Sequence, residues 1–388
     1  MRKIAIVYHY IALYRLPIFR ELMNSEILDF VILSGQTSDI SIEQVDIRYA
    51  QLPLKNGGLR WFFLKNIWLF KRKILWQSGL SRFVLANKFD TYIFLGNPYH
   101  LSTWVAAILA RLLNRKVYFW MHGVYKDKLI FVDYIKLFFF YKIANGYFLY
   151  GNRAAQILKK YYVGSESNIH IIYNSLDYKT ALSLRQKFSY ISTVHFRAEL
   201  FESSEIPTIC FIGRLNKIKR IDMLIEAQYR LTQKLGNTAF NLLLIGDGEE
   251  YYNLHQKVKN LGLERAVYFT GALYDEEKIA KFLSFSDLCV NPGNVGLTAI
   301  HSLSYGTPVI SHDNLNIQMP EVESILVGET GDLYQYNNLD SLINKIDKWF
   351  VKYPIKDELL INKCMSVVDR FYNPEYQRSI FESVLNNR

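Results

Sequence analysis

The stretch of this chain that decides its fold class begins with Ser286-Asp287-Leu288-Cys289-Val290-Asn291-Pro292-Gly293-Asn294-Val295-Gly296-Leu297 and continues through His301 to Gly306-Thr307-Pro308-Val309-Ile310. Its pattern predicts a buried strand, a loop that contains glycine, a helix from about Leu297 to Tyr305, and a second strand. The first N–H groups of a helix have no partner inside the helix, and the helix dipole favours negative charge there. The stretch therefore predicts a site suited to phosphate.

Around this stretch, apolar runs of strand length alternate with amphipathic runs of helix length. In the first half the expected strands are Lys3–Tyr8, Asp29–Ser34, Thr91–Leu95, Lys116–Trp120, Gly146–Tyr150 and His170–Tyr173. In the second half they are Thr208–Ile212, Phe240–Ile245, Val267–Thr270, Leu288–Asn291 and Pro308–Ser311. This alternation is typical of α/β domains with parallel, doubly wound sheets.

A chain of 388 residues exceeds what one hydrophobic core usually supports, so we expect two domains. The first covers residues 1–177 and the second covers residues 207–370. A polar linker is expected over residues 178–206, and a last helix over residues 371–388. Two Rossmann-like domains that face each other would place a ligand in the cleft between them.

Composition narrows the class of protein further. Half of the residues are hydrophobic and 21% are charged, which is a globular balance. Polar residues interrupt the longest apolar runs, so we expect no membrane-spanning helix, and the N-terminus reads as a first strand and not as a signal peptide. The three cysteines, Cys210, Cys289 and Cys364, lack metal-ligand spacing and are expected to be reduced core residues of a cytosolic protein.

The formal charge of +10 favours a polyanionic partner. Residues 54–89 contain no acidic residue, and their lysines and arginines are interleaved with tryptophan and phenylalanine. If this segment is a helix, one face carries Trp61, Lys65, Trp68 and Arg72. Such a face suits the headgroup layer of an anionic membrane.

Two other interpretations of this aromatic and basic segment stay open. It could be a core helix whose long side chains reach solvent, because apolar residues surround it on nearly every side. A groove for single-stranded nucleic acid is the weakest interpretation, since no recognition motif accompanies the segment. We therefore expect no nucleic-acid partner.

The second half of the chain contains the candidate residues for binding a diphosphate. Gly213-Arg214-Leu215 follows a strand and Lys219 comes five residues after Arg214. Two cations at the carboxyl end of a strand can neutralise a departing diphosphate, with arginine binding two oxygens at once. The alternative is a pair of solvated cations near a helix start.

Further segments follow in a fixed order: Gly246-Asp247-Gly248-Glu249, Phe269-Thr270-Gly271, Asp287, the opening stretch, Pro320-Glu321 and Thr330-Gly331. Together with Arg214 and Lys219 they resemble the carboxyl-terminal domain of family 4 glycosyltransferases, which are retaining enzymes of the GT-B fold. The resemblance is strong over residues 208–333. In the first half, Tyr14-Arg15-Leu16-Pro17-Ile18-Phe19, Trp120-Met121-His122-Gly123 and Tyr173-Asn174-Ser175-Leu176-Asp177 are similar to segments of bacterial members that build surface polysaccharides (capsule or O-antigen).

The resemblance implies an α/β protein with two facing Rossmann-like domains, the first for the acceptor and the second for the nucleotide-sugar, and a C-terminal helix that crosses back onto the first. It implies a nucleotide-diphosphate sugar as donor, with UDP favoured over GDP, and a glycan or polyprenyl-linked glycan as acceptor. It implies no cofactor and no obligatory metal, because Arg214 and Lys219 can supply the positive charge. With the basic segment, it places the enzyme in the cytoplasm, peripheral at the inner face of the membrane.

The resemblance also assigns roles to residues. Arg214 and Lys219 would hold the diphosphate, and His122 would reach the transferred sugar or its phosphate; Tyr14 and Arg15 would bind the acceptor. The donor-binding residues would be Gly213, Gly246, Leu273, Gly293, Asn294, Val295, Gly296, Leu297 and His301. The alternative for His122 is a histidine satisfied at a strand end, and for His301 a helix residue that packs under the site.

One departure from the family concerns the donor. Two glutamates of the family, separated by seven residues, usually contact the donor sugar and the ribose, and here those positions are Gly293 and His301. A histidine can make one hydrogen bond to a ribose hydroxyl, whereas glycine offers only its backbone. We expect a donor that differs from a glucose-type sugar, for example a deoxy or acetamido sugar. A sugar-nucleotide epimerase and a non-catalytic sugar-nucleotide-binding protein stay open as alternatives.

Overall fold

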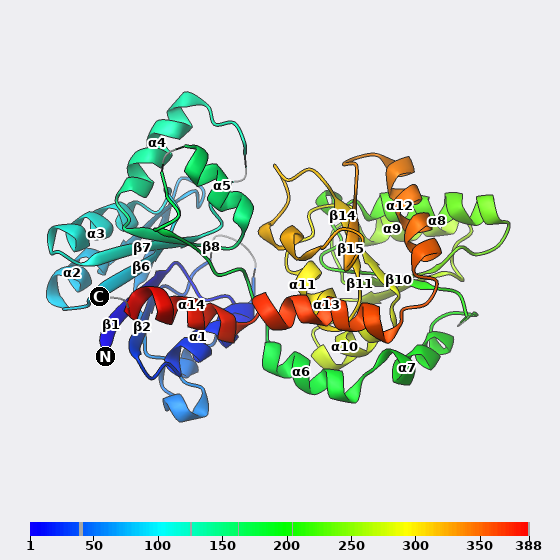
Figure 1. Cartoon of the computed structure of the whole chain (residues 1–388), viewed down its shortest axis with the longest axis horizontal. Coiled ribbons are helices and arrows are strands. Elements are labelled where there is room, and N and C mark those ends of the chain that lie inside the picture. The colour runs from blue at the N-terminus through cyan, green and yellow to red at the C-terminus, as the bar shows by residue number, and fades with distance from the viewer. Residues whose placement is uncertain (39–41, 125, 162, 204, 387–388) are drawn as a thin grey trace. The chain divides into compact units, whose positions relative to one another are not determined.

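The computed structural model describes residues 1–38, 42–124, 126–161, 163–203 and 205–386. The chain divides into two compact units, which Figure 1 shows in colours that follow the residue number. Unit 1 comprises Met1–Asp177 and Phe371–Arg388, and unit 2 comprises Tyr178–Arg370.

Unit 1 is built on a parallel sheet of seven strands in the order β3-β2-β1-β6-β7-β8-β9. The strands are β1 (Arg2–Tyr8), β2 (Leu28–Ser34), β3 (Trp61–Phe63), β6 (Thr91–Leu95), β7 (Lys116–Met121), β8 (Gly146–Leu149) and β9 (Ile169–Ile171). The helices are α1 (Leu16–Met23), α2 (Leu80–Ala86), α3 (Leu101–Leu112), α4 (Phe131–Lys142), α5 (Asn152–Lys160) and α14 (Pro374–Asn386).

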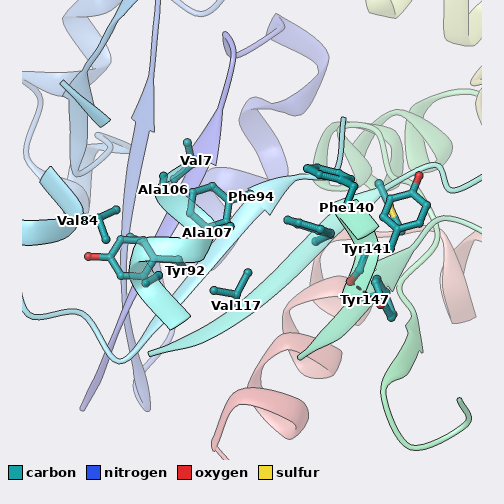
Figure 2. Packing of buried hydrophobic residues seen from close by; sticks show 14 of the residues in the cluster. Val7, Val84, Tyr92, Phe94, Ala106, Ala107, Val117, Phe140, Tyr141 and Tyr147 are labelled. Carbon is teal, nitrogen blue, oxygen red and sulfur yellow. Dashed lines mark hydrogen bonds between the residues drawn. The ribbon is translucent and has the colours of Figure 1, made fainter. Parts of the chain in front are cut away.

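Alternate side chains of the unit 1 strands fill two separate cores, one on each face of the sheet. On one face Val7 and Phe94 pack with Ala106 and Ala107 of α3, as Figure 2 shows. On the other face the core includes Phe381 of α14, and α14 packs against α1. The last helix therefore belongs to unit 1.

Unit 2 has a parallel sheet of six strands in the order β12-β11-β10-β13-β14-β15. The strands are β10 (Thr208–Ile212), β11 (Asn241–Ile245), β12 (Val267–Gly271), β13 (Leu288–Val290), β14 (Val309–His312) and β15 (Gly331–Tyr334). The helices are α6 (Tyr178–Lys187), α7 (Tyr190–Thr193), α8 (Ile221–Leu235), α9 (Tyr251–Asn260), α10 (Glu276–Phe285), α11 (Thr298–Ser304), α12 (Leu339–Lys352) and α13 (Glu358–Phe371). In Figure 1, α8, α9 and α12 lie on one side of this sheet and α10 and α13 on the other.

The predicted α/β class with two parallel, doubly wound sheets is confirmed, and each predicted strand overlaps an observed one. The residues from 178 to 206 do not form a linker. Their described part folds into α6, α7 and a 3₁₀ turn, Val194–Glu199, and belongs to unit 2.

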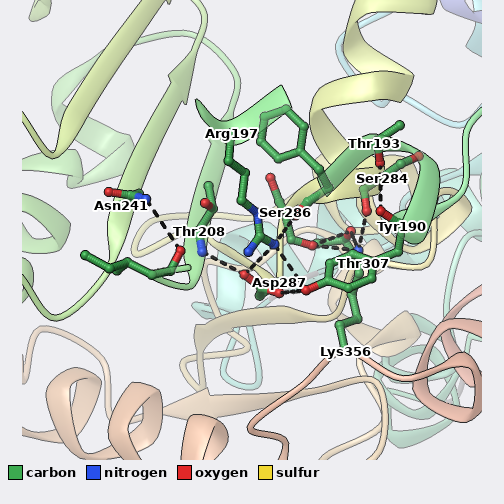
Figure 3. Close-up of polar contacts among 12 residues, drawn as sticks. Tyr190, Thr193, Arg197, Thr208, Asn241, Ser284, Ser286, Asp287, Thr307 and Lys356 are labelled. Atoms are coloured by element: carbon green, nitrogen blue, oxygen red, sulfur yellow. Dashed lines mark hydrogen bonds and ion pairs between the residues drawn. The ribbon is translucent and has the colours of Figure 1, made fainter. Parts of the chain in front are cut away.

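A buried polar cluster attaches this segment to the sheet of unit 2 (Figure 3). Arg197 Nη2 donates to Asp287 Oδ2 over 2.7 Å, and Tyr190 Oη donates to Asp287 Oδ1 over 2.8 Å. The backbone N–H of Thr208, at the start of β10, also donates to Asp287 Oδ2, over 2.7 Å. Lys356 Nζ donates to the carbonyl oxygens of Ser284 and Ser286 and to Thr307 Oγ1.

The prediction of a helix through the aromatic and basic segment is wrong. Beyond β3 the chain forms an antiparallel hairpin of β4 (Lys65–Leu69) and β5 (Ile74–Ser78). Side chains therefore alternate between two faces, and the four residues expected on one helical face are separated. Trp61 is buried and donates from Nε1 to Ser34, whereas Trp68 is half-buried and Lys65 and Arg72 are exposed.

Within the described ranges, no helix combines the length and the apolar character needed to cross a bilayer.

Candidate functional site

The sheet of unit 2 reverses its strand order between β10 and β13, which are neighbours in space. Doubly wound sheets bind ligands at the carboxyl ends of the strands at such a point. Here the loop after β10 contacts the loop after β13, because the N–H of Gly293 donates to the carbonyl oxygen of Lys219 over 3.0 Å. Thr298 Oγ1, at the start of α11, donates to the carbonyl oxygen of Ile212 over 2.9 Å. Two of the segments that the sequence assigned to the donor therefore lie together.

The two predicted cations of this loop have different surroundings. Lys219 Nζ donates to the carbonyl oxygen of Asn294, so the side chain already spans the two loops. Burial lowers the pKa of Lys219, and the nearby carboxylate of Glu321 partly offsets that effect. Arg214 is exposed, and within the described residues its side chain forms no ion pair. One cation is therefore fixed between the loops, and the other is available to a ligand.

Gly293 is required by close packing. A Cβ at this position would lie 2.0 Å from the carbonyl oxygen of Ile218 and 2.6 Å from the Cα of Lys219. Backbone cannot move aside as the tip of a side chain can, so a glutamate here would displace the turn that contains Lys219. The glycine therefore allows the turn with Lys219 to approach the loop after β13.

The loop from Gly293 to Leu297 does not offer all of its N–H groups to a ligand. Gly293 donates to Lys219, and the N–H of Val295 donates to Gln318 Oε1 over 3.0 Å. In the described part of the chain, the N–H groups of Asn294, Gly296 and Leu297 have no acceptor. Three donors beside Lys219 are thus available at this edge of the sheet.

His301 is paired with a carboxylate that the sequence analysis did not identify. His301 Nε2 lies 2.8 Å from Glu276 Oε1, and Tyr305 Oη donates to the same oxygen over 2.6 Å. Burial acts to raise the pKa of Glu276, but the charge and hydrogen bonds of His301 and Tyr305 outweigh it and leave the pKa below its ordinary value. Glu276 therefore supplies a carboxylate to the ring of His301 from another helix.

The remaining predicted donor residues lie along the same edge of the sheet. Gly213 follows β10, and its N–H donates to the carbonyl oxygen of Ile245 over 3.0 Å. Gly246 follows β11 with φ of +140°, and a Cβ there would lie 2.0 Å from the carbonyl oxygen of Gly213. Leu273 is half-buried in the turn between β12 and α10.

In unit 1 the predicted acceptor residue Arg15 is a buried cation, and the other predicted residue, Tyr14, is one of the rings around it. Arg15 is 5% exposed and ends the 3₁₀ turn Leu13–Arg15, directly before α1. Its Cζ lies between 5.0 and 5.6 Å from the centres of four rings, so these rings form an aromatic cage. The rings belong to Tyr8, Tyr14, Trp120 and Tyr150.

His122 follows β7 next to this aromatic cage, and its ring centre lies 4.6 Å from that of Tyr150. Burial, assisted by the charge of Arg15, lowers the pKa of His122 to about 3. Burial also lowers the pKa of His9 to about 3 and that of His100 to about 4. All three histidines are therefore neutral at pH 7.

Sequence reasoning missed Glu276, which is 25 residues before His301 and stands among the ordinary acidic residues of a helix start. It also missed His9, Trp120 and Tyr150 as neighbours of Arg15. His9 and Tyr150 directly follow β1 and β8, and Trp120 lies near the end of β7. The carboxyl ends of parallel strands share one edge of a sheet. The position of these three residues at the carboxyl ends of predicted strands could therefore have indicated that they lie near one another.

Residues 195–362 match the family described as "Glycosyl transferases group 1". Two curated relatives are each 32% identical to part of the chain. N-acetyl-alpha-D-glucosaminyl L-malate synthase of Bacillus anthracis aligns over 34% of this chain and 32% of its own length. The lipopolysaccharide core biosynthesis glycosyltransferase LpsE of Rhizobium meliloti aligns over 35% and 39%. The chain thus matches about a third of the length of these relatives.

Solved structures match the whole chain at lower identity. Anabaena Alr3699/HepE in complex with UDP has a TM-score of 0.70 at 16% identity and covers 100% of both chains. The lipopolysaccharide outer core galactosyltransferase WaaB in its apo form has a TM-score of 0.69 at 16% identity and covers 99% of both. Residues 195–362 are therefore similar to the glycosyl transferases group 1 family, in a chain that has the GT-B glycosyltransferase fold.

Proposed function

We propose that the protein is a retaining family 4 glycosyltransferase that transfers a sugar from a nucleotide-diphosphate sugar to a glycan or lipid-linked glycan in surface-polysaccharide synthesis. The observation that carries the proposal is the pair of loops at the β10–β13 switch point, where Lys219 and three available N–H groups lie together within the family domain. UDP is the proposed carrier, supported by the complex of Alr3699/HepE with UDP. The lipopolysaccharide enzymes LpsE and WaaB support the acceptor class.

In the proposed reaction, the bond between the sugar C1 and the phosphate oxygen breaks while a bond from the acceptor oxygen to C1 forms on the same face. The proton of the acceptor hydroxyl goes to the departing phosphate, so no protein nucleophile is needed. Negative charge grows on the leaving diphosphate, and preorganised donors stabilise such charge best. Lys219, Arg214 and the N–H groups of Asn294, Gly296 and Leu297 would supply these donors.

The surroundings of Gly293 and His301 support a donor preference that differs from that of a glucose-type enzyme. Position 293 has no room for a carboxylate beside the turn with Lys219, so a sugar hydroxyl there would meet only backbone. The Glu276–His301 pair would bind the nucleoside through the histidine ring, because a carboxylate fixes the tautomer and orientation of its histidine partner. We propose a deoxy or acetamido sugar as the donor group.

The hairpin of β4 and β5 supports contact with an anionic membrane surface, although through different residues than the sequence suggested. Its exposed side chains combine apolar and basic groups: Lys65, Ile67, Leu69, Phe70, Lys71, Arg72, Lys73 and Trp76. Phe70 is 74% exposed at the turn between the strands. Aromatic and basic groups that share one exposed surface suit a headgroup layer. A peripheral position at the cytoplasmic face would bring the enzyme to lipid-linked acceptors.

The test is a turnover assay with the full chain and a panel of UDP- and GDP-sugars, with nucleotide release measured with and without a polyprenyl-linked glycan. We expect slow release alone, a strong increase with acceptor, and the same rates in the presence of a metal chelator. A donor panel in which UDP-glucose is preferred by a wide margin would contradict the donor proposal. Binding of nucleotide-sugars without turnover of any of them would contradict the proposed activity.

A further inference from the structure

The guanidinium of Arg15 is a buried cation. Within the described residues, no carboxylate forms an ion pair with it. Burial of a charge costs several kcal/mol unless it is paired, and an arginine remains protonated in proteins. The four rings of the aromatic cage stabilise the charge through their faces. The Tyr14 hydroxyl also lies within hydrogen-bond reach of the guanidinium. One neutral hydroxyl supplies neither the counter-charge nor the paired oxygens that a guanidinium fork is shaped to meet.

Hydrogen-bond donors in the aromatic cage also lack acceptors. Nη1 of Arg15 and Nε1 of Trp120 are both buried, and neither has a hydrogen-bond partner among the residues that the structure describes. Both groups can only donate, and the guanidinium carbon lies 5.6 Å from the centre of the Trp120 ring. Buried donors are rarely left without an acceptor, so the aromatic cage lacks a hydrogen-bond acceptor for these two groups.

The aromatic cage lies where a doubly wound sheet binds ligands. Tyr8 ends β1, Trp120 lies in β7, and Tyr150 follows β8, so the cage is at the carboxyl edge of the unit 1 sheet. The hydroxyl oxygens of Tyr8 and Tyr150 are 3.2 Å apart and form a hydrogen bond with each other. Tyr14 is the partly exposed ring of the cage, so a ligand would enter the cage beside Tyr14.

We propose that the aromatic cage is an oxyanion site in which Arg15 Nη1 and Trp120 Nε1 bind a phosphate or carboxylate oxygen of a substrate. An oxyanion would supply both the missing counter-charge and the missing acceptors, and it would meet no competing carboxylate from the cage. The group can come from two sources, the diphosphate of the donor or an anionic group of the acceptor. The assignment to a substrate rests on the proposed glycosyltransferase function, whereas the anion site itself does not.

The test uses the full chain labelled with ¹⁵N-tryptophan, because the indole N–H signal of Trp120 reports directly on an acceptor at Nε1. Trp120→Phe assigns that signal among the six tryptophans. Inorganic phosphate, pyrophosphate and acetate are titrated at constant ionic strength. We expect the Trp120 proton to shift downfield with saturation, and the dissociation constant to rise at least about tenfold in Arg15→Met, which loses a charge-assisted contact. Arg20→Met is the matched control, since Arg20 also lies over a tyrosine ring but donates to the carbonyl oxygen of Gly57.

A second titration with UDP separates the two sources. If UDP moves the Trp120 signal, the site takes the donor diphosphate; if phosphate moves it and UDP does not, the site takes an acceptor oxyanion. A Trp120 signal that none of the anions moves in the wild-type chain would overturn the proposal, whether or not Arg15→Met folds. An equal loss of binding in Arg20→Met and Arg15→Met would also overturn it. Failure of turnover with every donor would contradict the proposed function and leave this titration unaffected.

Discussion

Each unit buries an arginine, and the two arginines are satisfied in different ways. Arg197 of unit 2 is 3% exposed, and its guanidinium binds the Asp287 carboxylate and the carbonyl oxygen of Phe285. Arg15 of unit 1 is 5% exposed and is surrounded by rings, and one of its terminal nitrogens has no partner in the described part of the chain. The first arrangement is complete within the folded chain, whereas the second lacks an acceptor. We infer that Arg197 stabilises its unit and that Arg15 is retained for a ligand.

The contrast between Arg197 and Arg15 can be tested most directly by the same substitution, arginine to methionine, at both positions. Arg197→Met would leave the Asp287 carboxylate buried without its cation, and removal of one partner from a buried pair costs about 3–5 kcal/mol. We expect the free energy of unfolding of unit 2 to fall by that amount. Arg15→Met removes a buried charge that has no counter-ion, so we expect a change within about 1 kcal/mol for unit 1.

Urea unfolding of the two variants measures both values. The exposed pair of Arg265 and Glu202 provides the control, because Glu202→Gln should change the stability by less than about 0.5 kcal/mol. If Arg15→Met is as destabilising as Arg197→Met, then Arg15 is a structural residue and the contrast between the two arginines disappears.

Lys219 is an intermediate case, because it is partly buried and its ammonium group donates to a carbonyl oxygen and not to a carboxylate among the described residues. If it stabilises the leaving diphosphate, Lys219→Ala should lower kcat/KM by roughly a hundredfold, and Arg214→Ala by a similar factor. Lys259, which is exposed on α9, is the matched control, and Lys259→Ala should leave kcat/KM unchanged. Retained activity in both Lys219→Ala and Arg214→Ala, with the fold intact, would refute their assigned role.

The sequence was sufficient for the sheets because buried parallel strands are short, continuous apolar runs such as Leu242–Ile245. The prediction from sequence was wrong at residues 61–78, where a helix was expected and a hairpin is found. The spacing of Trp61, Lys65 and Trp68 imitates a helix, and the hairpin turn gives no signal because Phe70, Lys71 and Arg72 adopt positive φ without a glycine.

The candidate site was predictable where backbone geometry requires a residue type, as at Gly293. It was not predictable where residues distant in sequence meet. Glu276 reaches His301 from another helix, and Trp120 reaches Arg15 from another strand. Such pairs depend on the register of packed elements, which no local pattern records.

The buried histidines of unit 1 offer a smaller test, through the pH dependence of stability. Burial lowers the pKa of His100 to about 4 in the folded chain, whereas the ordinary value is 6.5. The unfolded chain therefore binds a proton between pH 6.5 and 4 that the folded chain does not, and stability falls as the pH decreases through this window. From pH 7 to pH 5.5 the loss due to His100 should be about 1 kcal/mol. His100→Gln should reduce the pH dependence of unfolding by that amount, and an unchanged slope would mean that His100 is protonated in the folded chain.

The smallest expected effect concerns the Glu276–His301 pair, whose carboxylate is partly exposed and whose proposed role is to position the histidine. Glu276→Gln removes the charge but keeps the shape, so the ring of His301 should lose its fixed orientation without unfolding the unit. We expect the donor KM to rise by roughly three- to tenfold with kcat nearly unchanged, because binding to the nucleoside is the same in the ground state and the transition state. Glu277→Gln, on the same helix but paired with Lys187, is the control and should leave KM as it is. A fall in kcat in place of a rise in KM would place His301 at the reacting sugar and not at the nucleoside.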